Sequence, residues 1–109
     1  MTKITIKKTE AGDYAGFVCE GHAGYADKGE DIICAAISIL TINTESSLEL
    51  LAKEPIEVTQ DEENGVISVL FTQTPNEKSC LLMESYILGI SEIFHKYGKK
   101  YIQLEFEEV

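Results

Sequence analysis

Residues 32–52 read IICAAISILTINTESSLELLA, and this stretch decides the fold because its apolar residues recur with helical spacing over about five turns. At 100° per residue an apolar stripe falls on one face of the helix, as expected for a helix that packs on a core. The stripe consists of Ile33, Ala36, Ile37, Leu40, Leu48 and Leu51. Pro55 cannot continue a helix, so we predict a helix from about residue 32 to residue 52.

Two further sets of side chains flank this stripe. Cys34 heads a semi-polar flank with Ser38, Thr41 and Glu45, at spacings of four, three and four residues. The opposite flank is apolar and consists of Ile32, Ile39 and Leu50. These three side chains either cover another part of the same chain or form a dimer contact, and we favour burial within the same chain.

The remaining sequence predicts two hairpins, a second helix and a final strand. Residues 2–8 and 14–21 alternate as strands around a turn at 10–13, and residues 56–60 and 66–72 flank a turn that ends in Asn64-Gly65. Residues 74–77 read TPNE, a capping box with proline at the first helical position, which predicts a helix to about residue 97. We predict that residues 100–107 form the last strand. The order ββαββαβ indicates an α+β fold with a mixed or antiparallel sheet and two long helices.

Length and composition predict one domain over residues 1–109. The chain is 44% hydrophobic, and we expect neither a secretory signal nor an apolar run long enough to span a membrane. The three cysteines, Cys19, Cys34 and Cys80, lack the spacing of a disulfide framework, which favours free thiols in a reducing compartment. We therefore predict a cytoplasmic protein without a membrane partner.

The charge is strongly acidic. Nine Lys and Arg residues stand against nineteen Asp and Glu, for a net charge of −10. Binding to phosphate backbones needs clustered basic residues, so nucleic acid is a poor partner. An acidic surface attracts basic peptides or simply keeps the protein soluble, and we favour solubility.

Residues 21–38 read GHAGYADKGEDIICAAIS and place His22 twelve positions before Cys34. A thiolate is the reactive form of cysteine, and both a helix N-terminus and a nearby imidazole lower the pKa of a thiol. We predict that Asp31 is the N-cap of the helix, which makes Cys34 about the third helical residue. The free N–H groups of that first turn would then serve as an oxyanion hole.

Each of these residues also has an ordinary explanation. Asp31 is better explained as a cap than as a group that orients His22, and the Ser38 hydroxyl is most simply solvated or bonded within the helix. Gly24 and Gly29 make residues 23–30 a loop that can fold back over the helix start and gate a bound peptide.

A metal site is the competing interpretation. Cys19, His22 and Cys34 are potential zinc ligands, but the chain has no C-x-x-C pair and no second ligand couple, so we predict no metal and no cofactor. Cys19 and Cys80 are interpreted as packing residues, and His95 as a helix C-terminal residue.

The segment Gly21-His22-Ala23, followed by Gly29-x-Asp31-Ile32-Ile33-Cys34-Ala35-Ala36-Ile37-Ser38, closely resembles the signature of the ribosomal-processing cysteine protease family, called Prp. The order of strands and helices over the whole chain is similar too. The resemblance implies a small cysteine endopeptidase, usually a homodimer, that removes an N-terminal extension from large-subunit ribosomal protein number twenty-seven by cutting after an aromatic residue. It also implies that Cys34 is the nucleophile and His22 the base, and Asp31 and Ser38 match family positions.

Two other classes of function remain open. A noncatalytic acidic adaptor would bind a ribosomal or assembly factor and would not need Cys34. A redox-sensing thiol protein would undergo reversible oxidation at Cys34 without cleaving a peptide.

Overall fold

The structure is a computed structural model that describes residues 1–21, 28–97 and 100–109, with only the backbone of residues 28–31. These residues form strands and helices in the order ββαββαβ, which confirms the predicted α+β fold. The elements are β1 (Thr2–Lys8), β2 (Tyr14–Glu20), α1 (Lys28–Leu50), β3 (Ile56–Asp61), β4 (Val66–Phe71), α2 (Glu77–Tyr97) and β5 (Ile102–Glu108).

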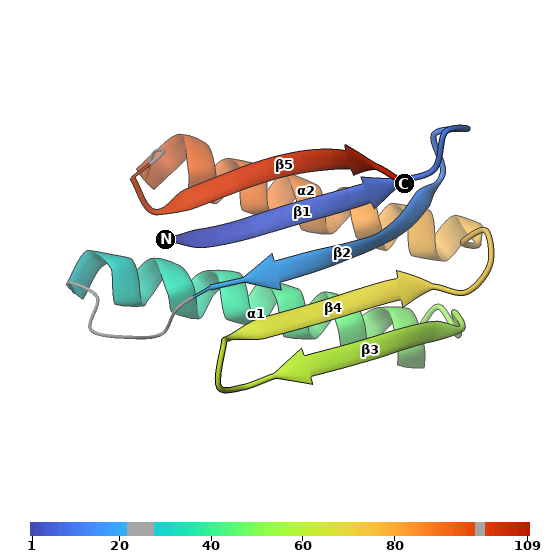
Figure 1. Cartoon of the computed structure of the whole chain (residues 1–109), viewed down its shortest axis with the longest axis horizontal. Coiled ribbons are helices and arrows are strands. Elements are labelled where there is room, and N and C mark those ends of the chain that lie inside the picture. The colour runs from blue at the N-terminus through green and yellow to red at the C-terminus, as the bar shows by residue number, and fades with distance from the viewer. Residues whose placement is uncertain (22–27, 98–99) are drawn as a thin grey trace.

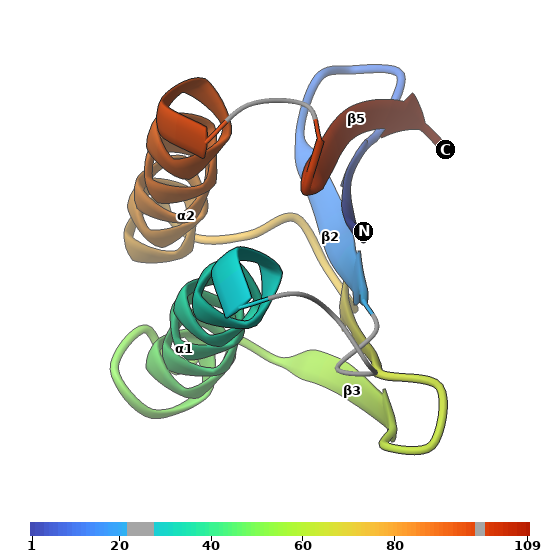
Figure 2. The ribbon, with the colours of Figure 1, turned by 90° about the vertical axis from the view of Figure 1, so that its left-hand side faces the viewer.

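The strands form one mixed sheet in the order β3-β4-β2-β1-β5 (Figure 1). Antiparallel pairs join β1 to β2, β2 to β4 and β3 to β4, whereas β1 and β5 are parallel. A parallel pair needs a crossover connection, and α2 lies in the connection that leads to β5. Both helices lie on the same side of the sheet, so the molecule has two layers (Figure 2).

The core lies between the helices and one face of the sheet. Alternation along the strands points Ile4, Ile6 and Phe17 toward the helices, and all three are fully buried. The ring of Phe17 packs on that of Tyr86 from α2, with 4.7 Å between ring centroids. The Tyr86 hydroxyl is hydrogen-bonded at 2.8 Å to Oγ1 of Thr41 on α1, so the two helices share a polar contact inside an apolar core.

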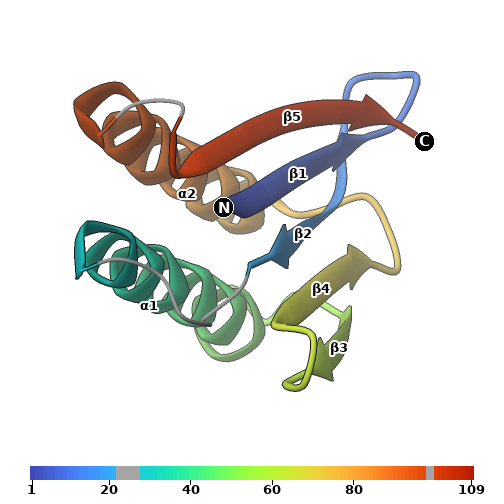
Figure 3. The same cartoon turned by 60° about the vertical axis from the view of Figure 1, so that its left-hand side comes forward.

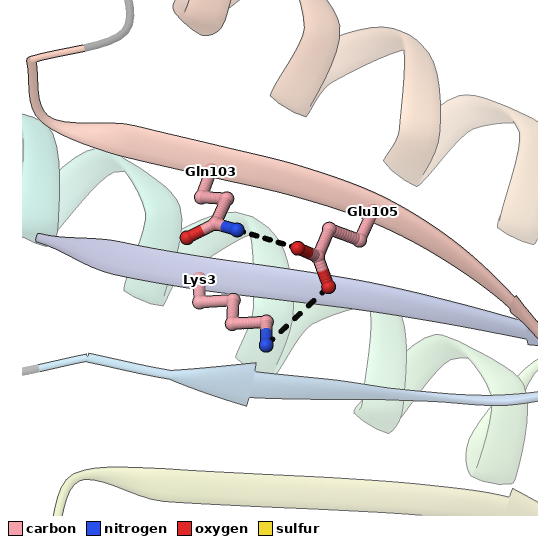
Figure 4. A network of polar contacts seen from close by, with 3 residues as sticks. All are labelled: Lys3, Gln103 and Glu105. Carbon is pink, nitrogen blue, oxygen red and sulfur yellow. Dashed lines mark hydrogen bonds and ion pairs between the residues drawn. The ribbon is translucent and has the colours of Figure 1, made fainter.

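The other face of the sheet is polar. Lys3 on β1 pairs with Glu105 on β5, with 3.3 Å between Nζ and Oε2, and Gln103 donates to the same carboxylate (Figure 4). Both charged side chains are about two-fifths exposed, so this ion pair contributes little to stability.

Helix α1 begins at Lys28, four residues before the predicted start, and ends at Leu50. The prediction that Asp31 is the N-cap was therefore wrong, because an N-cap has non-helical backbone angles and residue 31 is the fourth residue of the helix. Gly29 was expected in a loop but lies in the first turn of α1. No proline interrupts residues 28–31, so the chain can extend the helix through them.

Most of the predicted apolar stripe of α1 packs on the sheet. Ile33, Ile37 and Leu48 are buried, but Leu51 lies beyond the helix end and is exposed. The segment Ile32–Leu50 has the length and mean hydropathy, 1.2, of a membrane span by composition alone. A helix that packs on the core of a domain has the same composition, and the buried stripe of α1 is typical of such a helix.

The apolar flank of α1 is exposed. We expected Ile32, Ile39 and Leu50 to be buried within the chain, but they are 60%, 69% and 62% exposed. The prediction was wrong because the sheet lies on only one side of α1 (Figure 2) and covers the buried stripe of Ile33, Ile37 and Leu48, whereas the exposed flank lies elsewhere on the helix. The side chains Leu81 and Leu88 of α2 are likewise exposed.

Helix α2 begins at Glu77, and its N-cap is Asn76 instead of the predicted Thr74. Oδ1 of Asn76 accepts a hydrogen bond from the Ser79 N–H at 2.8 Å. The buried carboxylate of Glu54 accepts from the Asn76 N–H at 2.7 Å and from the Ser79 hydroxyl at 2.6 Å. Glu54 therefore connects the segment after α1 to the start of α2.

We predict that Glu54→Ala destabilises the protein. The change leaves the Asn76 N–H and the Ser79 hydroxyl without their acceptor, and a buried polar group without its partner costs about 1–3 kcal/mol. Urea unfolding followed by circular dichroism measures the loss. Glu57→Ala is the matched control, since Glu57 is exposed on β3 and its removal should change the free energy of unfolding by less than about 0.5 kcal/mol. Equal stability of the two variants would contradict the role of Glu54.

Candidate active site

Four segments that are distant in sequence meet at one end of the molecule. They are the beginning of β1, the end of β2, the beginning of α1 and the turn between β3 and β4, all at the left of Figure 1 and in front in Figure 3. The order of the strands causes this meeting, because β2 lies between β1 and β4 and runs antiparallel to both.

Cys34 stands at this meeting point as a partly buried residue in the second turn of α1. Its Sγ is hydrogen-bonded at 3.4 Å to Oγ1 of Thr2, the first residue of β1. Ser38 and Ile42 follow Cys34 at intervals of four residues and lie along the same side of the helix. The predicted semi-polar flank is thus confirmed for Cys34 and Ser38, whereas Thr41 is fully buried against Tyr86.

These side chains line a pocket of about 290 Å³. The helix supplies Cys34, Ser38 and Ile42, and the sheet supplies Cys19 with Val66 and Ile67 of β4. Gln60, Asp61 and Glu62, at the end of β3 and in the following turn, add polar groups to the wall. The pocket is therefore mainly apolar, with a thiol on one side and carboxylates on the other.

The charge states in the pocket follow from its local contacts. Asn64 donates two hydrogen bonds to Asp61, from its side chain at 2.7 Å and its backbone N–H at 3.1 Å, and these lower the pKa of that carboxyl. Asp61 is thus ionised at neutral pH. Burial raises the pKa of Cys19, so this second thiol stays protonated and is a poor nucleophile.

The structure brings together only some of the predicted site residues. Cys34 and Ser38 line the same pocket, and residue 31 lies in the backbone of α1. His22 and Gly24 lie outside the described residues, as does the side chain of Asp31. The oxyanion-hole prediction required Cys34 to lie in the first turn of the helix, where backbone N–H groups are free. Because α1 begins at Lys28, the N–H of Cys34 instead takes part in the hydrogen bonds within the helix.

Sequence reasoning missed the contact that fixes the end of β2. The N–H of Gly21, the residue before His22, donates to the carbonyl of Gly65 at 3.0 Å. Gly65 has a φ of 66°, and a Cβ at this position would overlap the carbonyl oxygen of Gly21. The Asn64-Gly65 pair signals the turn in the sequence, but no local signal shows that the turn contacts residue 21.

A partly exposed thiol in the wall of a mainly apolar pocket, on a small α+β domain, defines a candidate thiol-dependent enzyme. The family model described as cysteine protease Prp matches residues 1–103. The chain belongs to this cysteine protease family, and it is a cysteine protease.

Curated relatives carry the name of this family, and solved structures share the fold. The ribosomal processing cysteine protease Prp of Bacillus subtilis (strain 168) is 26% identical over 102 residues, which cover 89% of this chain and 90% of the relative. The protein of the same name from Staphylococcus aureus (strain Mu50) is 22% identical over 99 residues, 91% and 93% of the two chains.

The crystal structure of an essential ribosomal processing protease Prp from S. aureus with a substrate peptide superposes with a TM-score of 0.90 at 20% identity, covering 98% of this chain and 100% of that one. A second structure of that protein, with a covalently linked product peptide, has a TM-score of 0.86 at 21% identity and the same coverage. These superpositions show that the fold is shared.

We predict that Gly65→Ala lowers the peptide-cleavage activity more than Gly12→Ala does, although both variants place alanine at a positive φ. Alanine in the left-handed region costs about 1–2 kcal/mol, and at Gly65 the added methyl group also displaces the end of β2. Gly12→Ala is the matched control, because Gly12 has a φ of 90° and open space around its Cβ position. Peptide cleavage and thermal unfolding are measured for both variants. If Gly65→Ala were as active as Gly12→Ala, the contact with Gly21 would have no role in the site.

Proposed function

We propose that this protein is a cysteine endopeptidase in which Cys34 is the nucleophile and His22 is the general acid and base. Its substrate is the N-terminal extension of large-subunit ribosomal protein number twenty-seven. The observation that carries the proposal is the position of Cys34, whose thiol lies at the wall of the pocket in a chain of the cysteine protease family. The names of the relatives, which describe ribosomal processing, support the choice of substrate.

The reaction follows the chemistry of acyl transfer. His22 removes the proton of the Cys34 thiol, and the thiolate attacks the peptide carbonyl carbon to form a C–S bond. The C–N bond then breaks as His22 donates that proton to the departing amine. Water, activated by the same imidazole, attacks the thioester, and the C–S bond breaks to release the carboxylic acid and restore the thiol.

The walls of the pocket suit a substrate that is both apolar and basic. Ile42, Val66 and Ile67 offer apolar contacts to the aromatic residue that precedes the cleaved bond. Asp61 and Glu62 present carboxylates to basic residues, such as those of a ribosomal protein. We place the protein in the cytoplasm, where reducing conditions keep the thiol free.

We predict that Cys34→Ala abolishes cleavage of the tagged N-terminal region of the ribosomal protein, because it removes the attacking sulfur. His22→Ala should lower kcat by about a hundredfold or more, the usual contribution of acid–base catalysis. Gel electrophoresis and mass spectrometry of the shortened product measure both effects. Cys80→Ala is the control, since Cys80 lies on α2 outside the pocket and should retain full activity.

The same variants separate the other classes of function. Cleavage by Cys34→Ala would contradict the assignment of the nucleophile. A wild-type protein that binds the substrate and never cuts it would instead be an adaptor. Reversible oxidation of Cys34 without any peptide product would identify a redox sensor.

We also propose that the protein is a homodimer that buries the outer face of its two helices. Five large apolar side chains of the two helices are 60% exposed or more, and exposed apolar surface of this kind often marks a protein–protein interface. They are Ile32, Ile39 and Leu50 of α1 with Leu81 and Leu88 of α2. Their spacings of seven and eleven residues follow the helical repeat, so they lie on one side of each helix.

We predict that light scattering gives the wild-type protein twice its 12.1 kDa chain mass, and that Ile39→Lys shifts it to a monomer. A charge at the centre of an apolar interface is costly to desolvate. Val58→Lys is the control, because Val58 is exposed on the edge strand β3 and should leave the dimer intact. A monomeric wild-type protein would contradict the proposal.

A further inference from the structure

We propose that Thr2 is a positioning residue for the reaction: its hydroxyl fixes the Cys34 thiol and stabilises the thiolate. This inference rests on the proposed function, in which Cys34 is the nucleophile. Thr2 touches the sulfur and the wall of the pocket, and it lies 32 residues away from Cys34 in the sequence.

Thr2 is itself held rigidly. Its backbone N–H donates to the Tyr101 carbonyl at 2.9 Å, and the residue is only 3% exposed, at the start of β1, which lies between β2 and β5 in the sheet. A hydrogen-bond partner on such a strand has little freedom to move. The 3.4 Å contact between Thr2 Oγ1 and Cys34 Sγ therefore fixes the sulfur relative to the sheet.

The same side chain also shapes the end of β2. A Cβ added at Gly21 would lie 2.9 Å from Oγ1 and 3.0 Å from Cγ2 of Thr2, closer than ordinary van der Waals contact. Thr2 thus occupies the space that a side chain at position 21 would need. It therefore lies against both the end of β2 at Gly21 and the helix that carries Cys34.

A hydroxyl suits both charge states of the sulfur. It accepts a hydrogen bond from the neutral thiol, and after a rotation about its C–O bond it donates one to the thiolate. A hydrogen bond to a charged group contributes more than one to a neutral group, so the thiolate gains more from Thr2 than the thiol does. Loss of the hydroxyl should therefore disfavour the thiolate.

The test replaces the hydroxyl without changing the volume of the side chain. Thr2→Val should lower kcat about ten- to hundredfold, the factor that corresponds to a hydrogen bond to a charged group, while KM changes less than about threefold. The pH midpoint for alkylation of Cys34 by iodoacetamide, followed by peptide mass spectrometry, should move upward. Thr2→Ser, which keeps the hydroxyl, should stay near wild type in both measurements.

Two controls isolate the effect. Thr5→Val removes a buried hydroxyl from the same strand, on the face turned away from the helices, and should leave kcat and the alkylation profile unchanged. Burial raises the pKa values of Cys19 and Cys80, so both thiols should react slowly and report any general opening of the structure. If valine is not accommodated at position 2, Thr2→Ser and Thr2→Ala form a pair that differs by one oxygen.

The outcomes separate the two proposals. Cleavage by Cys34→Ala would overturn the proposed function. An inactive Cys34→Ala together with a Thr2→Val variant that matches Thr5→Val in kcat and alkylation would overturn the role of Thr2 alone. A Thr2→Ala variant equal to Thr2→Ser would overturn it as well.

Discussion

The contact that orients α1 is the buried hydrogen bond between Thr41 and Tyr86. Tyr86 is needed in the core for its ring, which packs on Phe17, but its hydroxyl is buried with it and requires a partner. Burial raises the pKa of this phenol, so it stays neutral and can donate or accept. Thr41 meets it at 2.8 Å, and α1 cannot rotate about its axis without breaking this bond.

The rotation of α1 in turn sets the direction of the thiol. Cys34 precedes Thr41 by seven residues, or nearly two full turns, so the two side chains lie on about the same side of the helix. With Thr41 directed into the core, Cys34 points toward the sheet, where it meets Thr2. The thiol also lines the pocket, and it is therefore partly exposed. A single buried polar pair thus connects the packing of the two helices to the geometry of the site.

The sequence predicted the elements well and their ends less well, for identifiable physical reasons. The alternation in the strands and the apolar stripe of α1 both result from burial of one face of the element. Such burial leaves a periodic pattern of apolar residues within a single segment of the sequence. The start of α1 was predicted from the capping chemistry of Asp31, but that chemistry does not stop the helical backbone from beginning earlier, at Lys28. At α2, TPNE looked like a capping box, but the buried carboxylate of Glu54, 22 residues before Asn76, determines where the helix begins.

The site could be predicted only where its residues lie on one segment. Cys34 and Ser38 were found because both belong to one helical row, whereas Thr2 and Gly65 reach the site through the strand order. Gly21 shows why such contacts leave no readable pattern: its backbone bonds to Gly65, and its missing side chain leaves room for Thr2. Two glycines and a threonine look like turn and strand residues in isolation. Together they fix Gly21 at the end of β2 through contacts between strands that no single segment reveals.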